Sequence, residues 1–167
     1  LETLGACPDQ PASRCYRSRD GWRPVRVIVD TIPIKGEAAR VVQLEFTEHG
    51  PIVGTDSALS RGYVIRFVGS EPGTAGYLAQ LSVNRASDWA SFKEAAYRWR
   101  LPTENLVYAD VDGNIGWVAV GLMPVRSWSG MLPVPGDGEY EWNGFLPFDQ
   151  LPQSYNPASG VIITANN

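Results

Sequence analysis

Alternation of apolar and polar side chains dominates the first 70 residues of the chain. The clearest alternating segments are 22–34, 40–46 and 63–68. A two-residue period is typical of strands with one covered face, so an antiparallel meander is predicted for residues 1–70. Pro24 and Pro33 favour edge or bulged strands, because proline cannot donate a hydrogen bond to a ladder. Residues 1–21 lack the alternation and are expected to form loops.

The period becomes helical between residues 71 and 101. Four residues have the spacing i, i+3, i+7 and i+10, namely Trp89, Phe92, Ala96 and Trp99. They fall on one face of a helix, and such a stripe is far more often packed on a sheet than used to bind a cofactor. Ser87 is the predicted N-cap of this helix. A shorter helical stretch is expected over residues 73–83.

Strands return after Pro102, separated by loops rich in proline and glycine. Residues 105–109 and 115–120 flank the pentapeptide DVDGN, whose Asp-Gly step is a strong hairpin signal. A last apolar run, residues 161–165, is predicted to be a buried strand. The fold class is therefore α+β, with antiparallel strands around a central helical pair. No linker is visible, so residues 1–167 are expected to form one segment of a domain.

Composition and charge narrow the function classes. The chain has 44% hydrophobic and 19% charged residues, which is typical of a globular domain. Its net charge is −4 and it has no Lys/Arg-rich run, so no nucleic acid partner is expected. No run approaches the roughly 20 apolar residues of a membrane span, and the start LETLGACPDQ lacks the basic and apolar regions of a signal peptide. Because the sequence starts at Leu1 without an initiator methionine, we expect a piece of a longer protein.

The two cysteines, Cys7 and Cys15, flank a polar loop that contains proline. A disulfide between them would close a short loop, contribute roughly 2–3 kcal/mol and indicate an oxidising compartment. Two free thiols are equally compatible with the sequence. Metal binding is not expected, because two cysteines and one distant histidine make a poor tetrahedral set.

His49 is the only histidine, and a nucleophilic triad would need it as the base. No Gly-x-Ser-x-Gly elbow accompanies it, so we interpret it as a strand-end residue whose ring bonds a backbone carbonyl. Asp137, Glu139 and Glu141 could act as paired carboxylates in a sugar-cleaving site. Adjacent acids in a turn are more often simply solvated.

The chain closes with Asn166 and Asn167, directly after the apolar run. An asparagine at the end of a buried strand needs hydrogen-bond partners. Its amide can donate either to a structural carbonyl or to a developing oxyanion. The residues themselves leave both roles open.

Three segments of the last third carry a family resemblance. They are NLVYADVDGNIGW, LPVPGDGEYEWNGFLPFDQLP and YNPASGVIITANN. In combination they closely resemble the penicillin acylase (penicillin amidase) family of N-terminal-nucleophile hydrolases, which also includes acyl-homoserine-lactone acylases. The resemblance implies a four-layer αββα sandwich, of which this chain is an internal segment of the large β subunit.

The resemblance also implies a mechanism. Family members are proenzymes that cleave themselves to expose an N-terminal Ser, whose α-amino group acts as the base. A terminal amine has a pKa near 8, so a useful fraction is neutral at physiological pH. Here the first residue is Leu1. The chain is therefore expected to lack its nucleophile and to be inactive alone.

Three site residues follow from matching this sequence to the family pattern. Asn166 corresponds to the oxyanion-hole asparagine, and Asn167 is expected to be a structural neighbour. Glu104 and Gln80 correspond to positions that line the acyl pocket. Both are polar, which favours a more polar or longer acyl group than phenylacetyl; equally, both side chains could point elsewhere.

The expected partners are the remainder of the acylase precursor, including its α subunit, and a small-molecule amide. No cofactor is required. Some family members bind calcium, with carboxylates that would come from outside this chain, so no metal is assigned. The usual location of family members, together with the cysteine pair, implies a periplasmic or secreted protein. The alternative function is a non-catalytic binding module that uses Trp128, Tyr140 and Trp142 as a platform for carbohydrate or peptide.

Overall fold

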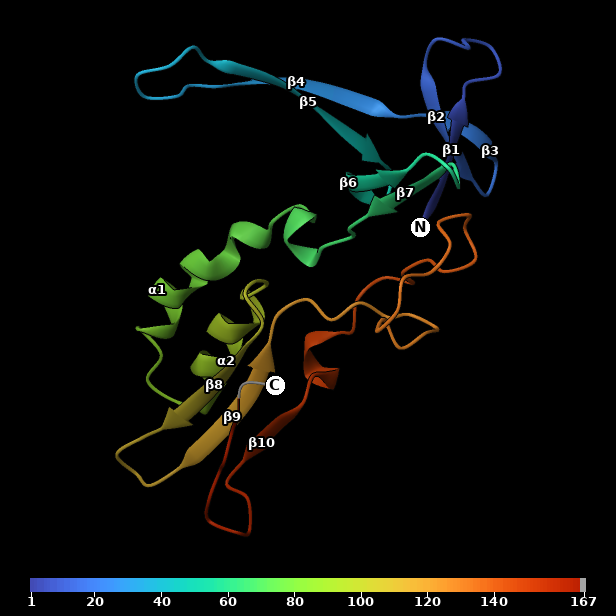
Figure 1. Cartoon of the computed structure of the whole chain (residues 1–167). Helices are drawn as coiled ribbons and strands as arrows, with labels where there is room; N and C mark the ends of the chain where they lie inside the picture. The colour runs from blue at the N-terminus through green and yellow to red at the C-terminus, as the bar shows by residue number, and fades with distance from the viewer. Residues whose placement is uncertain (166–167) are drawn as a thin grey trace. The chain divides into compact units, whose positions relative to one another are not determined.

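The computed structural model describes residues 1–165, apart from the side chains of residues 75, 77 and 79. It comprises two compact units (Figure 1). Unit 1 consists of Leu1–Phe67 and Arg126–Trp142, and unit 2 consists of Val68–Val125 and Asn143–Asn167. Each unit has its own sheet and its own buried cluster, so the two are described in turn.

Unit 1 is built on a seven-stranded antiparallel sheet with the order β3-β2-β1-β7-β6-β5-β4. The strands are β1 Glu2–Ala6, β2 Arg14–Ser18, β3 Gly21–Pro24, β4 Arg26–Ile32, β5 Arg40–Thr47, β6 Gly50–Asp56 and β7 Arg61–Val64. The predicted meander is present as β1-β2-β3 and β4-β5-β6-β7, joined by pairing of β1 with β7. The strands next to Pro24 and Pro33, β3 and β4, are the two edges, as predicted.

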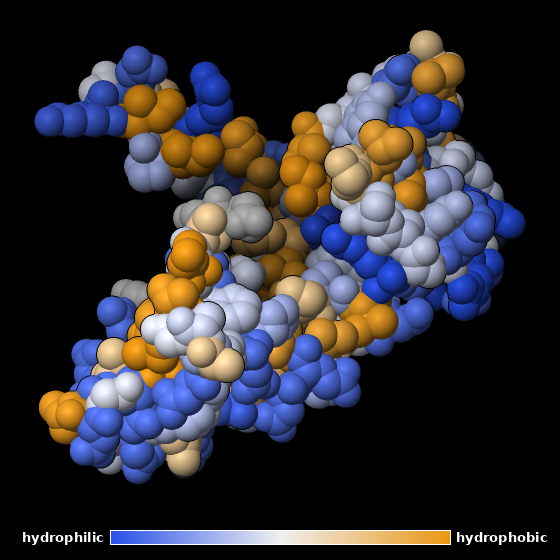
Figure 2. Space-filling view, turned by 90° about the horizontal axis from the view of Figure 1, so that it is seen from below, coloured by the Kyte–Doolittle hydropathy of each residue, from blue (hydrophilic) through white to orange (hydrophobic). Residues whose placement is uncertain are grey.

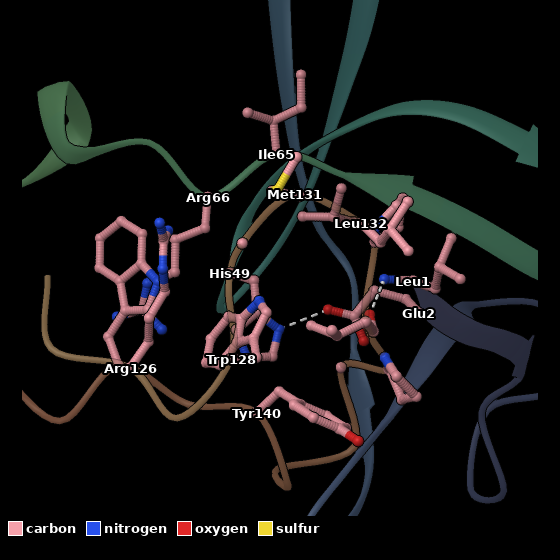
Figure 3. A pocket seen from close by; sticks show the side chains of 17 residues that line it. Leu1, Glu2, His49, Ile65, Arg66, Arg126, Trp128, Met131, Leu132 and Tyr140 are labelled. Atoms are coloured by element: carbon pink, nitrogen blue, oxygen red, sulfur yellow. Dashed lines mark hydrogen bonds and ion pairs between the residues drawn. The ribbon is translucent and has the colours of Figure 1, made fainter.

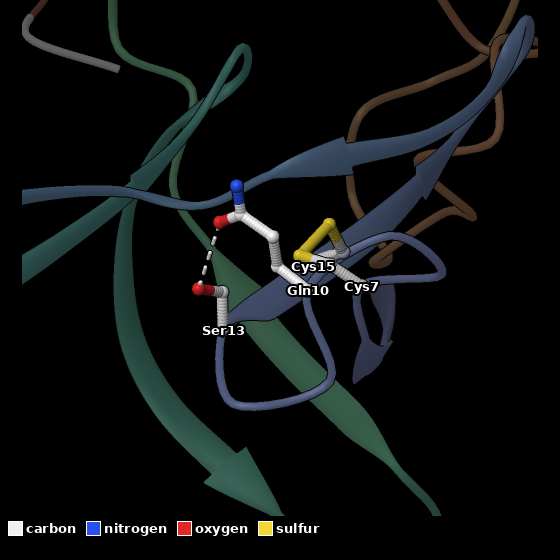
Figure 4. The surroundings of a disulfide bond; sticks show 4 residues. All are labelled: Cys7, Gln10, Ser13 and Cys15. Carbon is white, nitrogen blue, oxygen red and sulfur yellow. Dashed lines mark hydrogen bonds between the residues drawn. A yellow bond between two sulfur atoms is a disulfide. The ribbon is translucent and has the colours of Figure 1, made fainter.

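The prediction that residues 1–21 are loops was wrong, because β1 and β2 lie within them. These strands are five residues long, and Leu4 and Tyr16 are their side chains in the unit 1 core. Strands this short offer too few apolar positions for a period to be visible. A disulfide joins Cys7 and Cys15 across the intervening loop, where Ser13 donates to Gln10 (Figure 4). Both cysteines are buried.

The β4–β5 hairpin reaches away from the rest of the sheet (Figure 1). Its strands pair over seven residue positions, from Arg26 opposite Phe46 to Ile32 opposite Arg40. All side chains of β4 are exposed, including apolar Val29 at 63%. Figure 2 shows such apolar side chains, in orange, reaching the surface between polar ones. Because β4 is an edge strand, its outer hydrogen-bonding groups are not paired in the sheet.

Unit 2 combines a three-stranded sheet with the predicted amphipathic helix. The sheet has the order β10-β9-β8, with β8 Glu104–Ala109, β9 Ile115–Val120 and β10 Gln153–Tyr155. The preceding stretch, expected to be helical, forms a 3-10 turn at Thr74–Ala79 and the one-turn helix α1, Gln80–Val83. Helix α2 spans Trp89–Tyr97. None of the described helices is long and apolar enough to cross a membrane.

The core of unit 2 confirms the predicted helical stripe. Phe92 and Ala96 are buried, and Trp89 and Trp99 pack against the same cluster. The sheet contributes alternate residues of β8 and β9, namely Leu106, Tyr108, Val118 and Val120. Trp89 stacks on Tyr155 with ring centroids 4.9 Å apart. A side chain at Gly116 would overlap the Trp89 ring, so the glycine permits this close approach.

Helix α2 begins one residue later than predicted. Asp88, not Ser87, is the N-cap, because its backbone is extended and its carboxylate accepts from the Ser91 backbone N–H at 2.7 Å. The Ser91 hydroxyl in turn accepts from the backbone N–H of Asp88. The hydrogen bonds that the Asp88 carboxylate accepts from the backbone N–H and from the hydroxyl of Ser91 hold the pKa of Asp88 below its ordinary value. Ser87 also donates its backbone N–H to Ser91, so the capping motif spans the predicted position.

The predicted last strand is absent from the described residues. Residues 161–165 are irregular, and Ile163 is 88% exposed. A strand requires a hydrogen-bonded neighbour, and no strand of the described chain pairs with this segment. An apolar run alone therefore could not establish that the segment is buried.

We expect the isolated chain to self-associate through the exposed edge of the β4–β5 hairpin. A lysine on an edge strand opposes pairing with another chain, so Val29→Lys should shift the chain towards monomer. Multi-angle light scattering after size exclusion measures this shift. Val111→Lys is the matched control, because Val111 is fully exposed in the turn between β8 and β9. A wild-type chain that is monomeric at all concentrations would contradict the prediction.

Candidate functional site

The turn between β8 and β9 is organised by one carboxylate. Asp110 accepts from the backbone N–H groups of Asp112 and Asn114 at 3.0 and 2.9 Å. It also accepts from the Asn114 side-chain amide and the Tyr108 hydroxyl, both at 2.8 Å. The hydrogen bonds from Asn114 are the main reason that the pKa of Asp110 lies below its ordinary value. The DVDGN segment is therefore a tight turn in which the Asp110 carboxylate accepts four hydrogen bonds.

Asn156 connects this turn to the chain that follows β10. Its side-chain oxygen accepts from the backbone N–H of Ile115 at 2.9 Å, and its amide nitrogen donates to Asn114 at 2.8 Å. The residue adopts a positive φ of 45°, a conformation that asparagine tolerates better than most residues. The Tyr-Asn-Pro motif thus anchors the start of the C-terminal segment on the hairpin.

A second asparagine, Asn105, contacts the other end of that segment. Its amide nitrogen donates to the carbonyl oxygen of Ala165 at 3.3 Å. Its side-chain oxygen accepts from the indole N–H of Trp117 at 2.8 Å. Ala165 directly precedes Asn166, the predicted oxyanion-hole residue, which lies outside the described residues. Sequence reasoning missed Asn105, although the residue opens the first motif of the family resemblance.

The two predicted acyl-pocket residues both belong to unit 2. Glu104 is half-buried as the first residue of β8, opposite Val120 of β9. Gln80 is exposed as the first residue of α1. Their roles in an acyl pocket stay predictions.

In unit 1, His49 binds two carboxylates, so the expected bond to a backbone carbonyl was wrong. Its Nδ1 lies 2.6 Å from Oε1 of Glu2, and its Nε2 lies 2.8 Å from Oε1 of Glu141. Thr47 also donates to Glu2, and Arg66 pairs with Glu141 at 3.1 Å. Glu141 is thus a salt-bridge partner, not the simply solvated turn acid expected from the sequence. No sequence signal identified Glu2, which lies in a stretch predicted to be loop.

The protonation state of His49 follows from this geometry. Carboxylates only accept hydrogen bonds, so the His49 ring can donate to both carboxylates only when both of its nitrogens are protonated. The hydrogen bond to Glu2 is the main reason that the pKa of His49 lies above its ordinary value, and burial only partly opposes it. The chain Glu2, His49, Glu141 and Arg66 then alternates in charge. Glu2 is 1% exposed, and its Oε2 has no hydrogen-bond partner among the described residues.

A pocket of about 380 Å³ borders this cluster (Figure 3). A side chain at Gly136 would overlap the Glu2 carboxylate, so the glycine lets the loop backbone close over it. Trp128, Tyr140 and Trp142 all line the pocket, as a binding platform would require. However, the Arg66 guanidinium lies 4.5 Å from the centre of the Trp142 ring, and the Tyr140 ring meets Trp128 nearly edge-on. These contacts leave less free aromatic face for stacking with a ligand.

A metal site is not formed by these groups. Among residues 1–165, no three His, Cys, Asp or Glu side chains gather in a way that could hold a metal ion. In the His49 cluster both ring nitrogens already bond carboxylates, so neither has a free lone pair for a metal.

Comparison with known proteins identifies the family. The penicillin amidase family model matches residues 4–167. The chain belongs to the penicillin amidase family. It is 38% identical over 155 residues to penicillin G acylase of Escherichia coli, covering 91% of this chain and 18% of that protein. It is 33% identical to the penicillin acylase 2 proenzyme of Pseudomonas sp. (strain SE83), covering 92% of this chain and 20% of that protein.

Another relative is named for a different activity. The acyl-homoserine lactone acylase QuiP of Pseudomonas fluorescens is 32% identical over 90% of this chain and 19% of that protein. Among solved structures, a thermostable penicillin G acylase from Alcaligenes faecalis matches with a TM-score of 0.85 at 28% identity. That match covers 100% of this chain and 31% of the other. It confirms the predicted α+β class and the Ntn-hydrolase fold. The chain spans about a fifth of the length of its curated relatives.

The raised pKa of His49 predicts how the stability of unit 1 depends on pH. Stability from the protonated ring is fully present below the unfolded pKa of about 6.5 and is lost as pH rises through the higher folded pKa. Because His49 is the only histidine, an NMR titration of its ring protons reports this pKa directly. We expect a midpoint above about 6.5, and a lower midpoint in the Glu2→Gln variant. A wild-type midpoint at or below the ordinary value would refute the proposed protonation state.

Proposed function

We propose that this chain is part of an amidohydrolase that cleaves a linear amide into a carboxylic acid and an amine. The observation that carries the proposal is the family match over residues 4–167, together with relatives that are named as acylases. Substrate specificity is not common to those relatives, since one is named for penicillin G and another for acyl-homoserine lactones. The shared chemistry is hydrolysis of an amide that carries an acyl group.

In the proposed mechanism an N-terminal serine hydroxyl attacks the amide carbonyl, and its own α-amine accepts the proton. The tetrahedral intermediate then expels the amine, which takes up that proton, and water hydrolyses the acyl-enzyme. Leu1 has no nucleophilic side chain, so the serine would come from another part of the complete protein. On this proposal the chain alone hydrolyses nothing. His49 takes no part, because both its ring nitrogens bond carboxylates.

Asn166 is proposed to donate its side-chain amide to the oxyanion of that intermediate. Support comes from its place at the end of the YNPASGVIITANN segment, directly after a chain anchored by Asn156 and contacted by Asn105. A donor aimed at the developing charge acts in the transition state more than in the bound substrate. Its loss should therefore lower kcat more than it raises KM.

Replacing Asn166 tests this role in the complete enzyme. Asn166→Ala should lower kcat by roughly 100- to 1,000-fold, the range seen when one oxyanion donor is removed. Steady-state kinetics with a chromogenic amide measure the effect. Asn84→Ala is the control, because Asn84 is an exposed asparagine before α2. An Asn166→Ala enzyme with wild-type kcat would rule out the oxyanion role.

Glu104 and Gln80 are proposed to make the acyl pocket more polar than one that selects phenylacetyl groups. The support is their match to the family's pocket positions and the half-buried position of Glu104 at the start of β8. A half-buried carboxylate disfavours an apolar acyl group, because that group offers it no hydrogen bond.

Changing Glu104 to an apolar residue tests this specificity proposal. In the complete enzyme, Glu104→Ile should shift the kcat/KM ratio of phenylacetyl to polar acyl substrates towards phenylacetyl by roughly 10-fold, the effect of a modest change in pocket contacts. Glu94→Ile is the control, since Glu94 is an exposed glutamate on α2. An unchanged ratio would exclude a role for Glu104 in acyl selection.

The proposed partners are the remaining segments of an acylase precursor, and the proposed location is the periplasm or the exterior. The exposed apolar side chains of the β4–β5 hairpin support the proposed partners. The Cys7–Cys15 disulfide is compatible with the proposed location. Cell fractionation with a thiol-labelling assay would check the location. No cofactor is part of the proposed reaction, and no calcium site is proposed within this chain.

A further inference from the structure

We propose that His49 is a pH-sensitive latch that holds the 126–142 loop on the sheet of unit 1. The latch consists of the two hydrogen bonds that join the His49 ring to Glu2 of β1 and to Glu141 of the loop. The doubly protonated ring closes the latch, and the neutral ring opens it. This device lies within unit 1 and is independent of the proposed amide hydrolysis.

The backbone of His49 is held in place whatever the charge on its ring. The residue lies in the turn between β5 and β6, and its backbone N–H donates to the Thr47 hydroxyl at 3.1 Å. A side chain at Gly50 would overlap the carbonyl oxygen of Ile65, so the turn packs closely on the chain after β7. Because neither contact involves the ring, a change in protonation acts only on the partners of the ring.

Glu2 keeps its hydrogen bond when the ring loses one proton. Its side chain is 1% exposed, and its Oε1 accepts from His49 at 2.6 Å and from Thr47 at 3.0 Å. Figure 3 shows the His49 ring directed at this carboxylate. A buried carboxylate without a donor is costly, whereas the side chain of Glu141 is 35% exposed and can turn to water. The single proton of a neutral ring therefore stays on Nδ1.

Glu141 loses its donor in the neutral state. Nε2 of His49 then carries a lone pair that faces Oε1 of Glu141 at 2.8 Å, and two acceptors cannot form a hydrogen bond. Arg66, which lies 3.1 Å from the same carboxylate, remains as its partner. Glu141 therefore separates from His49, and this end of the loop is released from the β5–β6 turn.

The middle of the loop responds to the charge of Glu2. The backbone at Gly136 covers this carboxylate, because a side chain at Gly136 would overlap it. The Gly136 N–H donates to the Leu1 carbonyl at 2.8 Å, which fixes the cover. A neutral His49 ring still donates a hydrogen bond to Glu2, but it no longer offsets the buried charge. Lifting the Gly136 backbone lets water reach that charge, so the neutral ring favours an open loop.

Other charged groups face the latch from neighbouring elements. Glu48, next to His49, pairs with Arg23 of β3 at 2.7 Å, and the Tyr16 hydroxyl of β2 accepts from the Glu48 backbone N–H. Burial raises the pKa of Tyr16 above its ordinary value, so this hydroxyl stays protonated. Arg126 of the loop lines the adjoining pocket. Of the side-chain types at the latch, histidine is the one that ordinarily titrates between about pH 5 and 8.

The α-amino group of Leu1 is a further group that titrates near neutral pH. It donates to the Val134 carbonyl of the loop at 2.6 Å, and burial lowers its pKa from the ordinary value. A neutral amine still carries hydrogens, so this contact does not require the charge. The variants described below separate the two groups, because they leave Leu1 unchanged.

Hydrogen exchange in the complete protein measures the opening of the loop. The peptide that contains Gly136 is followed by mass spectrometry at several pH values, and each rate is divided by the intrinsic exchange rate at that pH. Protection should be highest below the pKa that His49 has in the open state. It should fall as pH rises through the higher pKa of the closed state, which the bonds to Glu2 and then to Glu141 raise.

The size of the fall is set by the same two pKa values. Protection should drop by about tenfold for each pH unit between them. The β9 peptide, Ile115–Val120, belongs to unit 2 and is the internal reference, so its protection should not follow the transition. Constant protection of the Gly136 peptide from about pH 5 to 9, which spans the usual histidine values, would overturn the latch.

His49→Gln assigns the transition to the ring. The substitution removes the titrating group, so the fall in protection should disappear. A fall as large as that of the wild type would overturn the latch and assign the transition to the Leu1 α-amino group. If the variant does not fold by circular dichroism, the exchange profile of the wild type decides.

Glu141→Gln tests the partner on the loop. Its amide both donates and accepts, so it can bind Nε2 of a neutral ring as well as a protonated one. The fall in protection should become smaller and its midpoint should move to lower pH, because one carboxylate fewer stabilises the protonated ring. Glu139→Gln is the matched control, since Glu139 is an exposed glutamate of the same loop. A folded Glu141→Gln protein with the wild-type midpoint and amplitude would overturn the inference.

Discussion

The carboxylate of Asp110 determines the register on which unit 2 depends. Four donors converge on it from the turn and from Tyr108, so β8 and β9 can meet in only one alignment. A slip of one residue would exchange the two faces of the hairpin. Val118 and Val120 would then leave the core around α2, and Asn105 and Trp117 would leave the opposite face. One acid in a turn thus separates the residues that stabilise the unit from those that contact the C-terminal segment.

Unit 1 is stabilised differently, because its buried apolar cluster is small. Leu4, Tyr16 and Val25 form that cluster, and the Cys7–Cys15 disulfide adds a covalent cross-link between residues of unit 1. The alternating charges of Glu2, His49, Glu141 and Arg66 join β1, the β5–β6 turn, the residues after β7 and the 126–142 loop. Buried charges are tolerated only where such partners are present. Hydrogen bonds and ion pairs therefore supply in unit 1 part of the stability that apolar packing supplies in unit 2.

Local patterns in the sequence were sufficient for elements whose determinants lie close together. The Trp89 to Trp99 stripe, the DVDGN turn and the edge strands beside Pro24 and Pro33 all depend on neighbouring residues, and the structure contains each of them. Predictions were wrong where the deciding partner is distant. The partners of His49 lie 47 and 92 positions away, and the irregular 161–165 segment has no partner strand in the described chain. Asn105 was missed for the same reason, since Ala165 is 60 positions further on.

The division of unit 1 into two stretches has a consequence for synthesis of the protein. Glu2 and His49 leave the ribosome before Glu141, which follows only after α2, β8 and β9 have been made. Until then His49 has one carboxylate partner, and the 126–142 loop cannot close over Glu2. During translation, unit 1 therefore stays partly assembled until most of unit 2 has been synthesised.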